Sequence, residues 1–148
     1  MKLIVSIFHP LIIGFIGSLF TASSLNNWYL YLNKPSFNPP NWIFGPAWTL
    51  LYLLMGLAFY FIWKKGYCKK CFYIYFIQLF LNFLWSFLFF TLQNPLLAFL
   101  NIIVLWLAIL LCIIWFYKVS KIAAYLFIPY ILWVSFASIL NLFIIILN

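Results

Sequence analysis

Residues 96–117 read LLAFLNIIVLWLAILLCIIWFY, a run with no charged side chain and a single amide, Asn101. A helix of this length can cross the hydrocarbon core of a bilayer, which needs about 20 apolar residues. Four further runs of comparable length, none with a lysine, cover residues 3–25, 42–63, 72–92 and 122–147. The pattern predicts an all-α integral membrane protein: one domain, a five-transmembrane-helix bundle.

The overall composition favours the same fold class. Hydrophobic residues make up 70% of the 148-residue chain and charged residues 5%, whereas soluble proteins average about half and about a quarter. A soluble fold of this size covers a large surface with polar groups, which eight lysines and one histidine cannot do. Membrane β-strands are a poor alternative, because the runs are about twice barrel-strand length and do not alternate.

Aspartate and glutamate are absent from the whole sequence. This absence excludes acid–base catalysis by paired carboxylates, and it excludes carboxylate-bound Mg²⁺ or Ca²⁺. The formal net charge of +8 does not indicate a nucleic-acid partner, because such binding needs a basic face on a soluble module. We therefore predict no classical catalytic residues and no nucleic-acid interface.

The lysines are interpreted as topology signals. With five spans, one side of the membrane carries only Lys34, and the other side carries all the remaining lysines: Lys2, Lys64, Lys65, Lys69, Lys70, Lys118 and Lys121. The positive-inside rule places the lysine-rich side, and with it the N-terminus, in the cytoplasm. The same bias favours a prokaryotic cell membrane. The alternative for the first run is a signal peptide, whose apolar stretch is usually shorter, about 7–15 residues.

The cysteines and the histidine give weak signals. Cys68 and Cys71 have redox or half-metal-site spacing, but there is no second pair, so we interpret them as incidental cysteines in a short cytoplasmic loop. Cys112 lies in an apolar run and is expected to be buried. A lone histidine, His9, cannot form a multi-ligand metal site, so no metal site is predicted; axial ligation of a haem is the unsupported alternative.

The segment 26–41 is longer than the other connections and is rich in proline and aromatic residues. Prolines cannot continue a helix and reduce the freedom of a loop, and aromatic side chains give it apolar surface to pack down. A long, ordered loop at the mouth of a bundle is typical of a lid or binding loop. The alternative is a rigid linker.

Polar and aromatic residues recur on single helix faces within the spans. The repeats are Trp48, Tyr52 and Gly56; Gln78, Asn82 and Ser86; and Pro129, Trp133, Ala137 and Asn141. One interpretation is interhelical contact, in which small residues let helices approach and amides bond across the bundle; it is favoured for Gln78, Asn101, Asn141 and Gly56. The other is a pocket for a flat apolar ligand, lined by Trp48, Asn82, Trp85 and Trp133. Pro129 is expected to kink the fifth helix.

Three motifs carry a resemblance to a known family. The first runs from Trp28-Tyr29 through Lys34-Pro35-Ser36-Phe37 and Pro39-Pro40 to Trp42, and continues with Pro46-x-Trp48 and Met55-Gly56. The others are Gln78-x-x-Leu81-Asn82-x-x-Trp85 and Pro129-Tyr130-x-x-Trp133-x-x-Phe136-Ala137-Ser138-x-x-Asn141. Together they resemble the TspO/MBR family, the tryptophan-rich sensory proteins and translocator proteins also known as peripheral-type benzodiazepine receptors.

The resemblance implies a five-helix bundle, commonly a homodimer, with a ligand pocket under the first loop. It implies tetrapyrrole ligands, protoporphyrin IX or haem, or drug-like molecules, and no obligatory cofactor. By position, the ligand-binding residues are Tyr29, Trp48, Asn82, Trp85, Trp133 and Ala137. The resemblance also implies light-dependent porphyrin degradation as an alternative activity, with Trp48 and Trp133 as the catalytic pair.

The chain departs from the family pattern at three places. It has Phe37 where Trp is common, Asn101 where an Asp is usual, and no Tyr-then-basic pattern after the fifth helix, so sterol binding through that pattern is not expected. The function predicted is a membrane receptor or sensor for tetrapyrroles, in which Trp48 and Trp133 stack on the ring, Asn82 donates to a polar edge and Lys34 meets a propionate. Porphyrin degradation, porphyrin transport and a purely structural role remain the alternatives.

Overall fold

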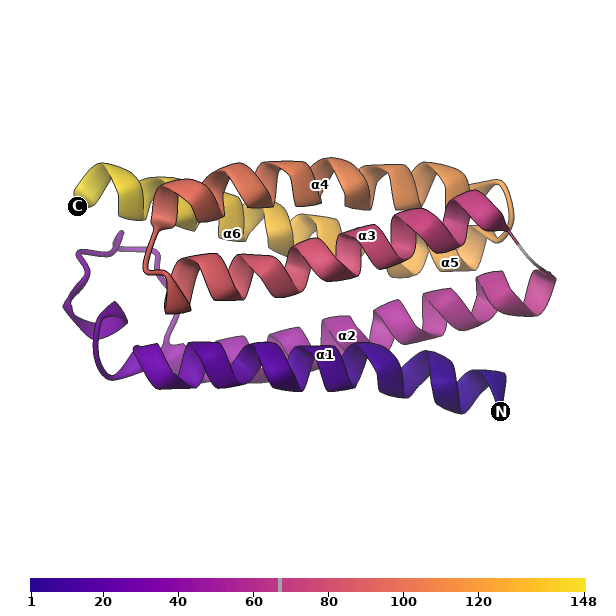
Figure 1. Ribbon diagram of the computed structural model, residues 1–148. Coiled ribbons are helices and arrows are strands. Elements are labelled where there is room, and N and C mark those ends of the chain that lie inside the picture. Colours follow the sequence, from indigo (N-terminus) through magenta and orange to yellow (C-terminus); the bar gives the residue numbers. More distant parts are fainter. Residues whose placement is uncertain (67) are drawn as a thin grey trace.

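The computed structural model describes residues 1–66 and 68–148, and within them it contains helices and no strand. The long helices are α1 (Lys2–Leu25), α2 (Asn41–Lys65), α3 (Lys69–Ser86), α4 (Pro95–Tyr117) and α6 (Ile128–Leu147). Shorter segments are the 3₁₀ helix η1 (Tyr29–Tyr31), the π-helix η2 (Phe87–Thr91) and α5 (Lys121–Leu126). As Figure 1 shows, these elements lie side by side as an elongated bundle, which confirms the predicted all-α fold class.

Five stretches are long and apolar enough to cross a membrane: Lys2–Leu25, Asn41–Lys65, Lys69–Thr91, Pro95–Tyr117 and Lys121–Leu147. Their outer faces carry large apolar side chains such as Phe15, Leu132 and Ile146, each about two-thirds exposed. A contiguous apolar exterior of this kind is unfavourable in water and favourable against acyl chains. The protein is therefore an integral membrane protein.

The two ends of the bundle differ in charge. The N-terminus and the connections α2–α3 and α4–α5 lie at one end, whereas the loop after α1 and the C-terminal end of α6 lie at the other (Figure 1). Lys34 is the lone lysine of the second end; the first end carries the remaining lysines of the sequence. The predicted segregation of the lysines thus holds in the fold.

The fifth span contains a break where a kink was expected. α5 ends at Leu126, Phe127 lies in a turn, and α6 starts at Ile128 with Pro129 in its first turn. Proline lacks the backbone N–H that a helix interior needs, but the first turn of a helix leaves that donor unused. Pro129 therefore starts a new helix, and the expectation of a kinked continuous helix is corrected to two helices in succession.

Cys68 and Cys71 are not the unpaired loop cysteines that were predicted. Cys68 is the N-cap of α3 and Cys71 lies in its first turn, which brings their Cα atoms to 5.3 Å and joins their sulfurs in a disulfide. Residues three apart at the start of a helix share a face, so this spacing aligns the two side chains. The interpretation as incidental cysteines is therefore wrong. Cys112 is a fully buried free thiol, as expected.

A buried hydrogen-bond chain joins α2, α3 and α6. The Tyr52 hydroxyl donates to Asn82 Oδ1 (2.6 Å), Asn82 Nδ2 donates to the Tyr130 hydroxyl (2.8 Å), and that hydroxyl donates to Gln78 Oε1 (2.8 Å). Polar groups in hydrocarbon are costly unless they are paired. This chain confirms the interhelical role predicted for Gln78.

Two further amides bridge helices in the same way. Asn101 Nδ2 of α4 donates to the Leu81 carbonyl of α3 (2.9 Å), and Asn141 Nδ2 of α6 donates to the Pro95 carbonyl of α4 (2.9 Å). Neither needs a charge, so Asn101 fills a structural role where the family pattern has an acid. Both amides act as predicted, between helices.

Gly56 marks the closest approach of α1 and α2. A Cβ at this position would lie 2.6 Å from the Ser6 carbonyl oxygen and 2.8 Å from Ile7 Cα, both backbone atoms of α1. We expect Gly56→Ala to lower the free energy of unfolding by about 2 kcal/mol, because the two helices must separate. Thermal unfolding in detergent measures this. Gly45→Ala is the matched control, since a Cβ there meets nothing within 4 Å; equal stability of the two variants would contradict the close approach.

Candidate functional site

A cavity of about 580 Å³ lies inside the bundle at the end that carries the loop 26–41. Its walls come from α1, α2, α3, η2 and α6, and the loop contributes Tyr29 and Asn38. The volume lies within the range of about 300–1,000 Å³ typical of small-molecule sites.

All six residues predicted to bind ligand line this cavity: Tyr29, Trp48, Asn82, Trp85, Trp133 and Ala137. They come from the loop, α2, α3 and α6, so only the packed bundle brings them together. Their contact with a ligand stays a prediction; their convergence on one cavity is a property of the fold.

Trp48 of α2 and Trp133 of α6 lie side by side. Their ring centroids are 6.4 Å apart and their planes are perpendicular, and Trp48 also lies 5.8 Å from the Tyr52 ring. Two perpendicular rings form a corner, not a parallel sandwich. A flat ligand in this corner can therefore stack on one indole and meet the edge of the other.

One buried indole nitrogen in this corner has no partner. Trp133 Nε1 is buried and makes no hydrogen bond to the described residues. By contrast, Trp85 Nε1 donates to Asn141 Oδ1 (3.0 Å), and the Trp85 ring stacks on Phe89 at 5.1 Å. Trp85 is thus held in place by protein contacts, whereas Trp133 keeps a spare donor.

Asn82 is hydrogen-bonded within the protein, and its contact with a ligand stays a prediction. Its Oδ1 accepts from Tyr52 and its Nδ2 donates to Tyr130, so the amide links the Tyr52 end of the buried hydrogen-bond chain to Tyr130. An amide nitrogen has two N–H groups, which leaves one for a ligand. The main effect of Asn82 is to hold Tyr52 at the cavity wall.

Lys34 is turned onto its own loop. Its ammonium donates to the carbonyls of Leu30 (3.5 Å) and Leu32 (3.2 Å) and lies 4.6 Å from the centre of the Tyr29 ring. Desolvation lowers the pKa of Lys34, and burial raises the pKa of the Tyr29 phenol, so Tyr29 is neutral at pH 7. In this arrangement Lys34 orders the loop and does not line the cavity.

The loop 26–41, which contributes Tyr29 and Asn38 to the cavity wall, is held by contacts with the end of α6. The Asn148 side chain accepts from the Asn33 backbone N–H (3.1 Å) and donates to the Asn33 carbonyl (2.9 Å). Phe37 packs edge-on against Phe143 at 5.2 Å. These contacts fix the position of the loop, and its role as a lid stays a prediction.

The sequence interpretation missed the small-residue face of α1. Gly14, Gly17, Ser18, Thr21 and Ala22 all line the cavity, and their spacing is that of one helix face. A methyl group on Gly14 would clash with the Tyr52 ring, so this glycine makes room for that ring. The helical spacing of small residues was the signal that could have identified this wall.

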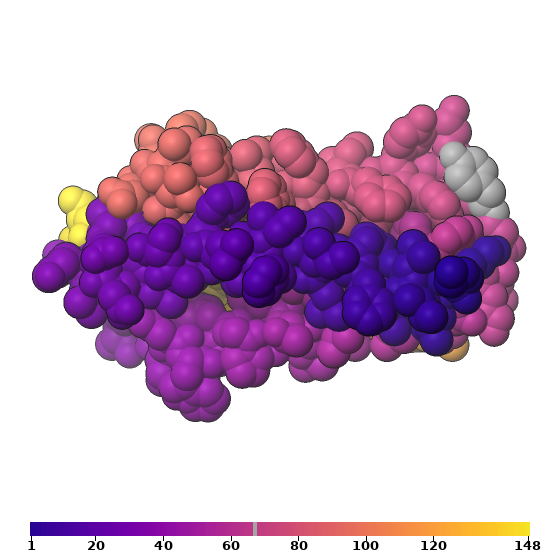
Figure 2. Space-filling model, turned by 60° about the horizontal axis from the view of Figure 1, so that its bottom comes forward, coloured from indigo at the N-terminus to yellow at the C-terminus, as the bar shows by residue number. Residues whose placement is uncertain are grey.

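The cavity opens sideways between α1 and α2. Figure 2 shows a hollow between these two helices, with part of the C-terminal region visible behind it. Ser18 and Ala22 of α1 and Gly45 and Thr49 of α2 line the cavity and are also exposed. The opening therefore lies on the side of the bundle, between two of its spans.

Fold and cavity together define a class of protein: a small integral membrane protein whose five spans enclose an aromatic-lined chamber beneath a proline-rich loop. The TspO/MBR family model matches residues 6–147, and the chain belongs to that family. The family resemblance inferred from the motifs is thereby confirmed.

Curated relatives agree with this assignment. The chain is 51% identical to the tryptophan-rich protein TspO of Archaeoglobus fulgidus, over 100% of this chain and 97% of that protein. It is 44% identical to the protein of the same name from Chlorobaculum tepidum, over 93% and 90%. It is 36% identical to the human translocator protein, over 86% of this chain and 78% of that protein.

Proposed function

We propose that this protein is a membrane receptor or sensor that binds a tetrapyrrole, protoporphyrin IX or haem, in the intrabundle cavity. The observation that carries the proposal is the corner formed by Trp48 and Trp133 on a cavity of about 580 Å³. A tetrapyrrole is flat and largely apolar, so indole faces and edges supply most of its contact area. Membership of a family that includes sensory and translocator proteins supports this role.

The direct test is a titration of the purified protein with protoporphyrin IX, followed by tryptophan fluorescence. We expect saturable quenching, because the tryptophans of the cavity wall lie next to the ligand. Trp63→Phe is the matched control, since Trp63 lies at the lysine-rich end, where it contacts Lys2; it should leave the midpoint unchanged. Quenching that rises linearly without saturation would show unspecific partitioning and would refute the proposal.

The ligand is proposed to enter through the side opening between α1 and α2. Gly45 is exposed, lines the cavity and has open space around its Cβ position. We expect Gly45→Leu to slow protoporphyrin IX association about tenfold, because the added side chain narrows the entrance without disturbing the core. Stopped-flow fluorescence measures the rate, with Gly45→Ala as the control. An unchanged association rate in the leucine variant would exclude this entrance.

The orientation and assembly are proposed from charge and family resemblance. The lysine-rich end is assigned to the cytoplasm of a prokaryotic cell, which puts the loop 26–41 on the outer side and the cavity in the outer half of the bundle. Single cysteines introduced at Ser36 and Lys65 of a variant lacking the native cysteines, and probed with an impermeant maleimide on whole cells, test this: only the Ser36 position should react. A homodimer is proposed from the family resemblance and is tested by the mass of the purified protein.

A further inference from the structure

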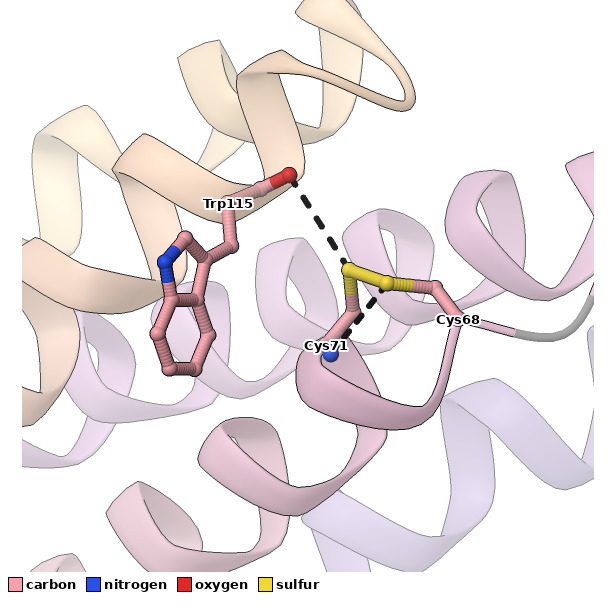
Figure 3. Close-up of a disulfide and its surroundings, with 3 residues drawn as sticks. All are labelled: Cys68, Cys71 and Trp115. Carbon is pink, nitrogen blue, oxygen red and sulfur yellow. Dashed lines mark hydrogen bonds between the residues drawn. A yellow bond between two sulfur atoms is a disulfide. The ribbon is translucent and has the colours of Figure 1, made fainter.

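A disulfide lies at the opposite end of the molecule from the cavity. Figure 3 shows Cys68 and Cys71 joined across the first turn of α3, beside the Trp115 carbonyl at the end of α4. Cys71 is 1% exposed and Cys68 is partly exposed. Cys68 is therefore the more accessible of the two residues to a reagent in water.

The two sulfurs have opposite electrostatic surroundings. The Cys71 backbone N–H points at the Cys68 sulfur at 3.3 Å, at the N-terminus of an 18-residue helix. An N–H donor and the positive end of a helix stabilise a thiolate. The Cys71 sulfur instead lies 3.9 Å from the Trp115 carbonyl oxygen, an acceptor that favours a protonated thiol. These surroundings favour a thiolate at Cys68 and a protonated thiol at Cys71 after reduction.

The surroundings of the pair are positively charged. Lys69 and Lys70 lie between the two cysteines, and Lys64 and Lys65 end the preceding helix α2. Lys70 lies over the Trp115 ring, 5.8 Å from its centre, next to the carbonyl that faces Cys71. The sequence contains no acidic side chain that could neutralise these lysines. Their field favours the Cys68 thiolate and attracts anions from solution.

We propose that Cys68 and Cys71 form a reversible dithiol–disulfide site that exchanges with low-molecular-mass anionic thiols and disulfides. The proposed cytoplasmic position of this end agrees with such a role, because cytosolic disulfides are mostly transient and redox-active. The site is separate from the ligand cavity, so it does not depend on tetrapyrrole binding.

With a disulfide RSSR, the reduced site reacts in two successive attacks. The Cys68 thiolate attacks one sulfur of RSSR, forms a Cys68–SR mixed disulfide and expels RS⁻. Cys71 then loses its proton, its sulfur attacks the Cys68 sulfur, and a second RS⁻ leaves. Two electrons pass from the protein sulfurs to RSSR, and the two protons lost by the cysteines accompany the two RSH formed. Reduction by a thiol follows the same steps in reverse.

The first experiment measures cysteine reactivity in the folded, detergent-solubilised protein. The protein is reduced with dithiothreitol, desalted and pulsed with iodoacetamide, and each cysteine is quantified by mass spectrometry. We expect Cys68 to be alkylated at least about tenfold faster than Cys71, with the buried Cys112 as the internal unreactive control. A disulfide that resists dithiothreitol until the protein unfolds, or equal rates for Cys68 and Cys71, would overturn the proposal.

The second experiment tests the order of attack and the preference for anions. With Cys71→Ser, the anionic disulfide 5,5′-dithiobis(2-nitrobenzoate) should leave a stable mixed disulfide on Cys68, whereas Cys68→Ser should react at most slowly. The rate of the wild-type dithiol with each disulfide is divided by the rate of free cysteine with the same disulfide. At low salt this relative rate should be about tenfold higher for the anionic disulfide than for cationic cystamine, and the difference should shrink at high salt.

Matched charge variants complete this test. Lys69→Gln combined with Lys70→Gln should reduce the preference for the anionic disulfide, and Lys34→Gln, at the far end, should not. The assignment of an anionic partner would be overturned if the anionic disulfide did not react faster than cystamine. It would also be overturned if this difference changed neither with salt nor on replacement of the two lysines. A Cys71→Ser variant that forms no mixed disulfide would overturn the exchange site itself.

Discussion

Replacement of Trp48 and Trp133 together by alanine is expected to weaken protoporphyrin IX binding by roughly 100-fold or more. Removal of a large aromatic contact from a binding site costs about 2 kcal/mol, which corresponds to roughly 30-fold in the dissociation constant. The two indoles touch the same region of the cavity, so their effects should not add fully.

A loss of affinity in this double variant can be assigned to the cavity, because both indoles are only partly buried and form the cavity wall. Their loss enlarges the cavity, and because Trp48 also contacts Tyr52 and Tyr130, the fold of the double variant is checked separately. The quenching titration needs a tryptophan near the ligand, and Trp85 supplies it in the double variant. Trp106→Ala, outside the cavity, is the control for the loss of a tryptophan as such. Unchanged affinity in the double variant, with the fold intact by circular dichroism, would place the ligand elsewhere.

Tyr130→Phe is expected to lower the free energy of unfolding by about 3 kcal/mol. The Tyr130 hydroxyl is the middle of the buried chain: it accepts from Asn82 and donates to Gln78. Its removal leaves two buried amides each without one partner, and an unpaired buried polar group costs about 1–3 kcal/mol. A single interhelical hydrogen bond in a membrane is worth less, about 0.6–2 kcal/mol, so a loss of this size requires that the chain acts as a unit.

Thermal or denaturant unfolding in detergent measures this loss, and Tyr125→Phe is the matched control. Tyr125 is about 59% exposed, so the loss of its hydroxyl leaves no buried partner. Tyr130→Phe should also weaken protoporphyrin IX binding several-fold, because Asn82 loses one of its two protein partners and holds Tyr52 less rigidly at the cavity wall. Equal stability of Tyr130→Phe and Tyr125→Phe would mean that the chain contributes nothing to the bundle.

The site was predictable where a single helix face carried the signal. Trp48 with Tyr52, and Trp133 with Ala137, each recur at helical spacing, and both pairs line the cavity. The family motifs then selected these residues from the other aromatics of the chain. The small-residue face of α1 was missed, because small residues inside a membrane helix equally indicate close helix packing.

Side-chain partners were the least predictable feature. Lys34 turns back onto the loop carbonyls, Asn82 is engaged by Tyr52 and Tyr130, and Cys68 and Cys71 form a disulfide. In each case the partner is chosen by geometry that spacing alone does not specify. The disulfide is the nearest to an exception, since its two residues lie within one helical turn.

The sequence by itself determined that lipid surrounds most of the protein, how many spans it has and how charge is distributed between its two ends. These follow from composition and run length, because a bilayer accepts only long, uncharged helical segments. The tertiary structure alone decided that the cavity opens between α1 and α2. It also decided which polar groups pair and which, such as Trp133 Nε1, make no hydrogen bond to the described residues. Those features depend on how helices distant in the sequence pack against one another, and in a bundle this is set by side-chain shape summed over many contacts.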